Sequence, residues 1–374
     1  MVEPAARPAL VGVEGIATPV TAHINAVGTA TPDHDIHAAF IGWARDRLRN
    51  PRDARLFDRM ASRSGIAHRW SVLPPTDTGG SPVSADGFYA DDLLPGTAAR
   101  MAAYATAAPE LALQAITALA AQHPIEGVTH LVVASCTGFM APGVDQIVAQ
   151  RLGLPGSVER LLVGFMGCYA AVAALRSARH IVRSDAYARV LVVCVELSTL
   201  HLQADAAIEP LLAMLQFGDG AAAALVTADH HGFAMAEPFA TTLADSADLI
   251  RWDITDRGFA MHLSGEVPGR IAAGLADADF ARAATGGRPP ESIDGWAVHA
   301  GGRSILDAVE SALHLAPTAL DASRGVLQAF GNMSSATLMF VLERLLAGPP
   351  VREGVALAFG PGLAAEGFGF RSVG

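Results

Sequence analysis

Long apolar runs that alternate with alanine-rich segments are the feature of this sequence that most restricts its fold. The runs are THLVVASC (129–136), ARVLVVCVE (188–196) and AAAALVTAD (221–229), and each is apolar almost throughout. This pattern is typical of strands buried on both faces. Helices are predicted between these strands, near 144–152 and 169–183. Buried strands separated by helices predict an α/β fold whose sheet is covered on both sides.

A similar order of elements returns in the second half of the chain, after a more polar stretch at 230–256. The sequence there predicts helices near 267–285, 303–313 and 333–346, and strands at 294–300 and 354–360. We therefore predict two halves of similar pattern, 1–229 and 230–374. The segment 73–97 is rich in Pro, Gly, Asp and Ser and is predicted to be a loop.

Composition excludes several classes of protein. Of the 374 residues, 51% are hydrophobic and only 17% are charged, which indicates a large core or a subunit interface. The formal net charge of −11, without a cluster of Lys or Arg, argues against a nucleic-acid partner. No apolar stretch reaches the length of a membrane-spanning helix. The N-terminal segment 1–15 lacks the pattern of a signal peptide and is predicted to be a short arm.

Cysteine usage indicates a reducing compartment. The chain has three cysteines, Cys136, Cys168 and Cys194, which lie far apart and outside any zinc-ligand spacing. An odd and low number of cysteines does not suggest a disulfide framework. We therefore expect a cytoplasmic protein without a bound metal.

Cys168 is the strongest candidate nucleophile, in the run GFMGCYAAVAALRSARHIVR (164–183). Gly164 and Gly167 interrupt the chain before it, and a helical pattern follows. The cysteine is therefore predicted to lie at a helix N-terminus, where free backbone N–H groups and the helix dipole favour a thiolate. Locally, a small buried apolar residue explains the same cysteine equally well.

Two further residues are placed where a cleft would form. His299 ends a predicted strand, Asn332 precedes a predicted helix, and both have glycine neighbours. Taken singly, His299 could be a core histidine and Asn332 a turn residue. Cys, His and Asn also occur together in papain-like proteases, but the Cys-Gly-Ser-Cys-Trp signature of those enzymes is absent, as are phosphate-loop and dinucleotide-binding motifs.

Six motifs resemble those of one family and occur in the same order. The resemblance runs from NAVGTATP (25–32) to the end of the chain. They are GFMGCYAA around Cys168, LQFGDGAAA (215–223), MHLSGEVPG (261–269), WAVHAGGRSILD (296–307), GNMSSAT (331–337) and FGPGLAAEGF (359–368). The chain resembles the type III polyketide synthases, the chalcone-synthase-like homodimers of the thiolase superfamily. The resemblance implies a thiolase-like five-layer αβαβα fold with two similar halves, acting as a homodimer.

The activity that the resemblance implies is an acyl transfer. An acyl-CoA starter would be loaded on Cys168, extended by decarboxylative Claisen condensation with malonyl-CoA, and cyclised to a pyrone, a resorcinol or another phenolic product. CoA thioesters would be substrates, with no permanently bound cofactor and no metal. A carrier protein is compatible with this chemistry but not required.

The family's catalytic residues fall on Cys168, His299 and Asn332 of this chain. His299 would hold Cys168 as a thiolate through an ion pair. His299 and Asn332 would both donate hydrogen bonds to the thioester oxygen, first in the enolate and then in the tetrahedral intermediate.

Other family positions map onto the gate, the cavity and the CoA tunnel. They are Phe217 and Met261 as gatekeepers, Cys136, Ser198, His201 and Glu196 in the cavity, and Arg59, Arg63, Gly301 and Gly302 along the CoA path. Each also has a structural explanation: core packing for Phe217, a buried thiol for Cys136, a solvated helix face for the arginines. Met261 stands where plant members carry Phe, and its flexibility predicts a softer passage that admits an aliphatic or otherwise non-planar starter.

Two other functions remain open at this point. The first is a single condensation by a class III β-ketoacyl carrier-protein synthase, which shares the Cys, His and Asn set. The second is a non-catalytic scaffold that kept the thiolase fold. Turnover of acyl-CoA and malonyl-CoA without a carrier protein would distinguish a polyketide synthase from the first alternative. Alkylation of Cys168 by iodoacetamide would test the second.

Overall fold

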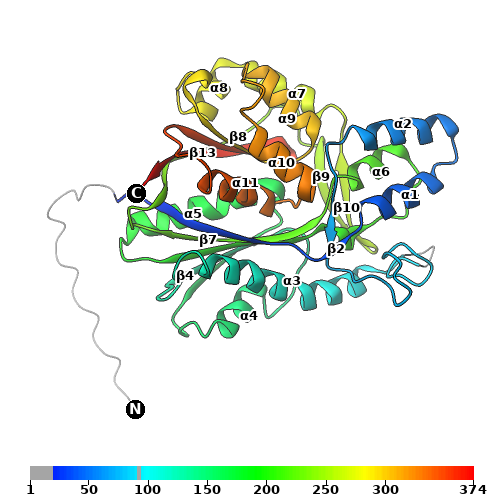
Figure 1. Ribbon diagram of the computed structural model, residues 1–374, viewed down its shortest axis with the longest axis horizontal. Coiled ribbons are helices and arrows are strands. Elements are labelled where there is room, and N and C mark those ends of the chain that lie inside the picture. The colour runs from blue at the N-terminus through cyan, green and yellow to red at the C-terminus, as the bar shows by residue number, and fades with distance from the viewer. Residues whose placement is uncertain (1–19, 91–93) are drawn as a thin grey trace, which may run out of the picture.

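Two helices whose N-terminal turns are buried on every side organise the fold. The computed structural model describes residues 20–90 and 94–374. In it, the first seven residues of α11 (Ala336–Leu346) and the first six of α5 (Ala170–Ser184) are all buried. A helix of this kind must be covered on all sides. Figure 1 shows both helices between two layers of strands.

The two strand layers belong to one continuous sheet. Its order is β11-β12-β13-β8-β1-β7-β6-β4-β5. The strands are β1 (His23–Ala30), β4 (His130–Ser135), β5 (Glu159–Gly164), β6 (Val190–Leu197), β7 (Asp219–Thr227), β8 (Gly232–Thr242), β11 (Gly295–Val298), β12 (Gly354–Gly360) and β13 (Ala364–Val373). The strand β8 joins the layers, because its first residues pair with β1 while its whole length pairs with β13.

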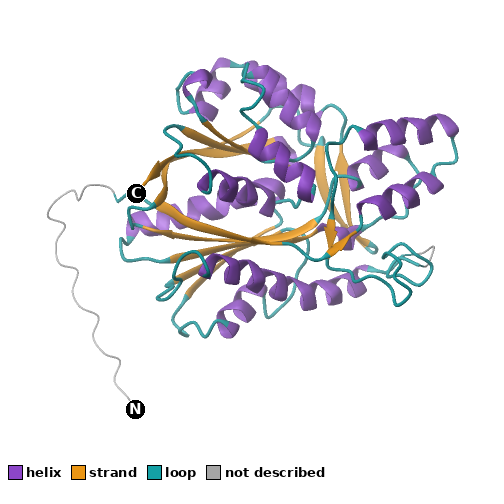
Figure 2. Cartoon of the chain, in the orientation of Figure 1, coloured by secondary structure: helices purple, strands orange, loops and turns teal. Residues whose placement is uncertain are grey.

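Helices cover the outer faces of both strand layers, as Figure 2 shows. On one side α3 (Thr97–Ala120) packs against β1, β6 and β7, with α4 (Val144–Arg151) beside it. On the other side lie α7 (Val267–Ala276), α8 (Ala278–Thr285) and α9 (Arg303–Ala312). The predicted α/β fold with five layers is confirmed by this arrangement.

The remaining elements build one end of the molecule and connect the layers. They are α1 (His37–Arg47), α2 (Pro51–Ser62), α6 (Ile208–Met214), α10 (Asp321–Phe330), and two small antiparallel sheets made by β2 (His34–Asp35) with β3 (Trp70–Ser71) and by β9 (Ile250–Thr255) with β10 (Gly258–Leu263).

The buried strands and central helices agree with the sequence prediction, while two segments differ from it. The helix predicted near 267–285 is two helices, because the Asp277 side chain accepts hydrogen bonds from the backbone of residues 279 and 280 and starts α8. The polar stretch 230–256 contains β8 and β9, since a strand with one exposed face carries polar residues. The predicted N-terminal arm lies outside the described residues.

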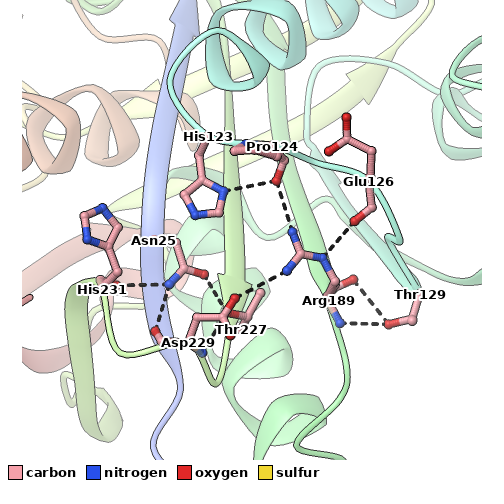
Figure 3. Close-up of polar contacts among 9 residues, drawn as sticks. All are labelled: Asn25, His123, Pro124, Glu126, Thr129, Arg189, Thr227, Asp229 and His231. Atoms are coloured by element: carbon pink, nitrogen blue, oxygen red, sulfur yellow. Dashed lines mark hydrogen bonds and ion pairs between the residues drawn. The ribbon is translucent and has the colours of Figure 1, made fainter.

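A polar network ties the strands together at the end opposite the nucleophile (Figure 3). Asn25 of β1 donates to the carbonyls of Asp229 and His231 at 3.0 Å each and accepts from Thr227 at 2.8 Å. Arg189, just before β6, donates to loop carbonyls and to the Asp229 carboxylate. These bonds satisfy carbonyl groups in the turn that follows β7 and in the loop between α3 and β4.

Within residues 20–90 and 94–374, no helix has the length and apolar character needed to cross a membrane.

Candidate active site

Cys168 lies in a tight turn that connects β5 to α5. The turn is a short 3₁₀ helix, Gly167–Tyr169, and α5 begins at Ala170. Gly167 has φ of 76°, and a Cβ atom there would lie 2.3 Å from Cδ of Pro361, so only glycine fits. The FGPG motif of the second half therefore packs against the turn that carries the nucleophile. The predicted helix N-terminus is confirmed, with one 3₁₀ turn before the α-helix.

Burial controls the protonation of the two ionisable groups at this site. Desolvation raises the pKa of Cys168 to about 12, although the Ser334 hydroxyl and the Asn332 amide beside the sulfur pull it down in part. Desolvation also lowers the pKa of His299 to about 3. Both shifts favour the neutral forms. Burial thus works against the ion pair expected from the family resemblance.

His299 and Asn332 come together around the backbone of Gly301. The Asn332 amide donates to the Gly301 carbonyl at 3.3 Å. An added Cβ on Gly301 would lie 3.3 Å from the His299 ring, which shows how closely the backbone passes the imidazole. The Asn332 side-chain oxygen accepts from the Ser334 backbone at 2.8 Å, so the amide is oriented with its NH₂ group on the His299 side.

Phe217, the predicted gatekeeper, is held next to the same asparagine by backbone hydrogen bonds of its two neighbours. Asn332 donates its N–H to the Gln216 carbonyl at 2.8 Å and accepts from Gly218 N–H at 3.0 Å, which forms an isolated bridge. The Arg69 guanidinium donates to the Phe217 carbonyl at 2.8 Å. The positions of the predicted gatekeeper and of the candidate catalytic amide are therefore set together.

A small cavity of about 340 Å³ contains the thiol. Its walls include Cys168 together with four of the predicted gate and cavity residues, Cys136, Ser198, Phe217 and Met261. Sequence reasoning missed the other six wall residues, among them Trp252 and Ser334. Ser334 lies two positions after Asn332 in the GNMSSAT motif, which was a usable signal. Trp252 lies in the polar stretch 230–256, and its only sequence signal was that it is a large aromatic residue among polar ones.

Cys136 and Glu196 form hydrogen bonds that stabilise the turn containing Cys168. The Cys136 sulfur accepts a hydrogen bond from Gly167 N–H at 2.9 Å, and burial raises the pKa of its thiol. The Glu196 carboxylate accepts from the Cys136 backbone and from Thr137 Oγ1 at 3.0 Å each, and from the Ser335 hydroxyl. Both residues thus hold the neighbourhood of Cys168 in place.

We expect Glu196 to make stability depend on pH. Its side chain is fully buried, and desolvation raises the pKa from 4.5 to about 7. The unfolded chain therefore ionises first, and the free energy of unfolding falls as pH rises from 4.5 to 7, by about 3 kcal/mol at most. Replacing Glu196→Gln should flatten this slope, measured by urea unfolding across that range.

Asp219 also makes the free energy of unfolding fall as pH rises, because burial raises its pKa to about 6. The comparison is therefore made between the variant and the parent protein at each pH. Parallel curves for the two proteins would mean that Glu196 does not titrate in this range.

His201, predicted as a cavity residue, is not among the residues that line the cavity around Cys168, and both of its ring nitrogens are occupied. Nε2 bonds to the Thr137 carbonyl at 2.7 Å, and Nδ1 accepts from Phe259 N–H at 3.0 Å. The ring stacks on Phe259 with centroids 4.2 Å apart, and burial lowers its pKa to about 3. This histidine is therefore a neutral cross-link between the β4 loop and β10.

Of the predicted CoA-binding residues, the two arginines are exposed and the two glycines, Gly301 and Gly302, are buried. Arg59 is exposed on α2, and Arg63 is the exposed residue that follows this helix. Arg303, next to Gly301 and Gly302, donates to the Arg63 carbonyl at 3.3 Å. The structure thus brings the two predicted CoA segments together beside His299.

Comparisons with known proteins agree along nearly the whole chain. The sequence profile described as chalcone and stilbene synthases, N-terminal domain, matches residues 14–230, and the profile of the C-terminal domain matches residues 235–374. The bisdemethoxycurcumin synthase of Oryza sativa subsp. japonica is 33% identical over 372 residues, which cover 92% of this chain and 91% of the relative.

Two solved structures are similar in fold. The first is the C-terminal type III polyketide synthase domain of Steely1, a type I/III hybrid from Dictyostelium, with a TM-score of 0.85 at 24% identity, covering 95% of this chain and 100% of that one. The second is PKS-I from the brown alga Ectocarpus siliculosus, with a TM-score of 0.84 at 27% identity, covering 96% of this chain and 100% of that one.

Proposed function

The chain belongs to the chalcone and stilbene synthase family of type III polyketide synthases, and we propose that Cys168, His299 and Asn332 are its catalytic residues. As a member of this family it is an acyltransferase that uses CoA thioesters as substrates. The two halves 1–229 and 230–374 would then contribute the nucleophile and the two hydrogen-bond donors, respectively.

One observation carries the assignment of His299. Its ring is 1% exposed, yet neither Nδ1 nor Nε2 has a hydrogen-bond partner among the described residues. A buried polar group without a partner costs about 1–3 kcal/mol, so natural proteins rarely keep one without a use. The use that fits beside a nucleophilic thiol is proton transfer and donation to a substrate oxygen.

The starter is loaded by attack of the Cys168 sulfur on the thioester carbonyl of the acyl-CoA. Because burial favours the neutral thiol, the proton leaves for His299 as the S–C bond forms. One Asn332 N–H is occupied by the Gly301 carbonyl, and the other, beside the Cys168 sulfur, would donate to the oxyanion. His299 then returns the proton to the departing CoA thiolate.

Chain extension uses the same two donors. Malonyl-CoA loses carbon dioxide, and the electron pair of the broken C–C bond becomes an enolate whose oxygen accepts from His299 and Asn332. The enolate carbon attacks the acyl group on Cys168, a C–C bond forms, and the cysteine sulfur is released. Repetition and ring closure would give a pyrone, a resorcinol or another phenolic product.

The test is incubation of the protein with acyl-CoA and malonyl-CoA in the absence of any carrier protein, with products identified by mass. Several extensions and a cyclised product are expected. No turnover until a carrier protein is added would instead indicate a class III β-ketoacyl carrier-protein synthase. An unreactive Cys168 toward iodoacetamide, together with no turnover, would indicate a scaffold.

The three cysteines, which are buried and unpaired, support a reducing, cytoplasmic location.

We also propose that the protein is a homodimer formed at the edge strand β5. Leu161 and Leu162 are neighbours on this strand, so their side chains point to opposite faces, yet 43% and 49% of them are exposed. Phe139 nearby is 47% exposed and lies against Phe165, which follows β5. An uncovered apolar edge strand is a surface that pairs with another chain.

Replacing Leu162→Asp is expected to weaken the dimer at least about a hundredfold, because an unpaired charge would be buried in the interface. Light scattering after size exclusion would then give the mass of one chain. The matched control is Tyr187→Asp, which places the same charge on a tyrosine that is 91% exposed after α5 and should leave the mass unchanged. A parent protein that already elutes with the mass of one chain would contradict the proposed dimer.

A further inference from the structure

Arg69 carries a positive charge inside the protein, next to the isolated bridge between Phe217 and Asn332. It immediately precedes β3, and only 2% of the residue is exposed. Burial lowers the pKa of its guanidinium to about 9, although the carboxylates of Asp35 and Asp219 act against this shift. The side chain is therefore charged at neutral pH. Because a charge is costly to remove from water, its place in the core calls for a function.

The guanidinium binds two backbone carbonyls on the segment that leads into the bridge. Nη1 donates to the carbonyl of Met214, at the end of α6, at 3.0 Å and to that of Phe217 at 2.8 Å. Nε donates to Nδ1 of His37, at the start of α1, at 2.9 Å. Figure 1 shows α1 and α6 at the same end of the molecule. Arg69 therefore cross-links α1 to the segment between α6 and β7.

The aliphatic part of the same side chain packs against the residue before Asn332. Gly331 has φ of 69°, and a Cβ atom there would lie 2.9 Å from Cγ of Arg69 and 2.8 Å from the Gln216 carbonyl oxygen. Asn332 itself is held by the two backbone bonds of the bridge, to Gln216 at 2.8 Å and from Gly218 at 3.0 Å. One side chain thus contacts both segments that form the bridge.

The orientation of the guanidinium is fixed by its own neighbours. Oδ1 of Asp35 accepts from the backbone N–H of His37 at 3.0 Å and from that of Arg69 at 3.2 Å. The His37 ring accepts the Nε–H of Arg69, and burial together with the charge of Arg69 lowers the pKa of His37 to about 4, so the ring is neutral. The Phe40 ring lies 4.5 Å from the guanidinium carbon. A planar guanidinium held in this way can fix the carbonyls that it binds.

The position of the Asn332 amide decides how well it stabilises an oxyanion. A donor acts only within hydrogen-bond distance of the place where negative charge develops, and a shift of about 1 Å can cost about a hundredfold in rate. The side-chain bonds of Asn332 to Ser334 and Gly301 orient the amide locally. The bridge fixes its backbone relative to the first half of the chain, and Arg69 holds the other segment of that bridge.

We propose that Arg69 is a positioning residue that holds the bridge between Phe217 and Asn332, and through it the Asn332 amide, where the enolate oxygen forms. The inference rests on the proposed function, because it concerns a donor assigned there. Loss of the guanidinium should lower kcat for the decarboxylation of malonyl-CoA and leave KM nearly unchanged, since Arg69 acts on the donor and not on the binding of CoA.

The experiment is a double-mutant cycle of Arg69→Met and Asn332→Ala, with release of labelled carbon dioxide from malonyl-CoA as the readout. Methionine keeps an unbranched side chain and removes every donor of the guanidinium. Arg69→Met alone should lower kcat per folded molecule about ten- to a hundredfold and change KM less than about twofold. In the Asn332→Ala background the same replacement should lower kcat less than about twofold, because the donor that Arg69 positions is already absent.

The matched control is Arg100→Met, on α3. Arg100 is 0% exposed, its Nη1 donates to the carbonyls of Leu200 and Leu202 at 2.8 Å each, and its guanidinium lies over the Tyr89 ring. It therefore resembles Arg69 in burial and in the kind of bonds it makes, but it contacts neither segment of the bridge. Arg100→Met should weaken the fold, measured by urea unfolding, and leave kcat per folded molecule unchanged.

If Arg69→Met does not fold, Arg69→Lys takes its place in the cycle. The ammonium keeps the buried charge but lacks the planar fork that binds several acceptors at once. A loss of kcat of at least about threefold is expected, and it should again disappear in the Asn332→Ala background.

An unchanged kcat in the Arg69 variant, or an equal loss with and without the Asn332 amide, would overturn the inference and leave the proposed function intact. An equal loss of kcat in Arg100→Met would do the same, because the loss would then follow from the fold. A parent protein that releases no carbon dioxide from malonyl-CoA would overturn the proposed function itself.

Discussion

Replacing Cys168→Ala should lower polyketide formation at least about a thousandfold, because the acyl chain then has no covalent attachment point. Release of carbon dioxide from malonyl-CoA should fall much less, since this step depends on His299 and Asn332. Both rates can be followed in the same reaction, by mass of the products and by labelled malonyl-CoA.

Cys194→Ala is the matched control for this replacement. Cys194 is a fully buried cysteine on β6 that lies outside the catalytic cavity. Its loss should reduce stability slightly and leave both rates unchanged. If Cys168→Ala still forms polyketides at a comparable rate, Cys168 is not the nucleophile, whatever the outcome for decarboxylation.

Replacing Asn332→Asp should lower kcat/KM about 10²- to 10³-fold, equivalent to about 3–4 kcal/mol of barrier. The substituted side chain can still accept from Ser334 N–H, as Asn332 does at 2.8 Å, so the local turn is kept. What disappears is the NH₂ group that donates to the enolate oxygen, and a carboxylate there would repel the developing negative charge. Steady-state kinetics with malonyl-CoA measure the effect.

The control for a merely structural loss is Asn25→Asp, at the opposite end of the sheet (Figure 3). Asn25 is as buried as Asn332, at 2% exposure, and its amide also donates to backbone carbonyls. This variant should unfold more easily but keep its kcat per folded molecule. Equal losses of kcat in both variants would argue that Asn332 acts only through the fold.

The buried strands and central helices were predictable because their signal is local. A run such as that of β6 is apolar at every position, and a strand of this kind can be stable only inside a covered sheet. The long helix α3 and the strands β1 and β13 were not predicted. α3 contains Pro109 in its interior, and β13 alternates glycine with phenylalanine near its middle, so neither shows a simple period.

Local sequence could not predict whether the pKa of Cys168 is raised or lowered. The sequence places the thiol at a helix N-terminus, where a lower pKa is expected. In the folded chain, Pro361 packs against the turn, and the thiol and His299 are both cut off from water. Desolvation then dominates and the pKa of Cys168 rises.

The sequence by itself determined the family, the three candidate catalytic residues and the α/β layers. These depend on residue types and on spacing along the chain, which any reader of the sequence can measure. Only the tertiary structure decided the burial of Cys168 and His299, the two hydrogen bonds that fix the His201 ring, and the set of residues that line the cavity around the thiol. Those properties arise where segments far apart in sequence meet, as where Trp252 donates to the Cys136 carbonyl, because burial and cavity shape exist only after the chain has packed.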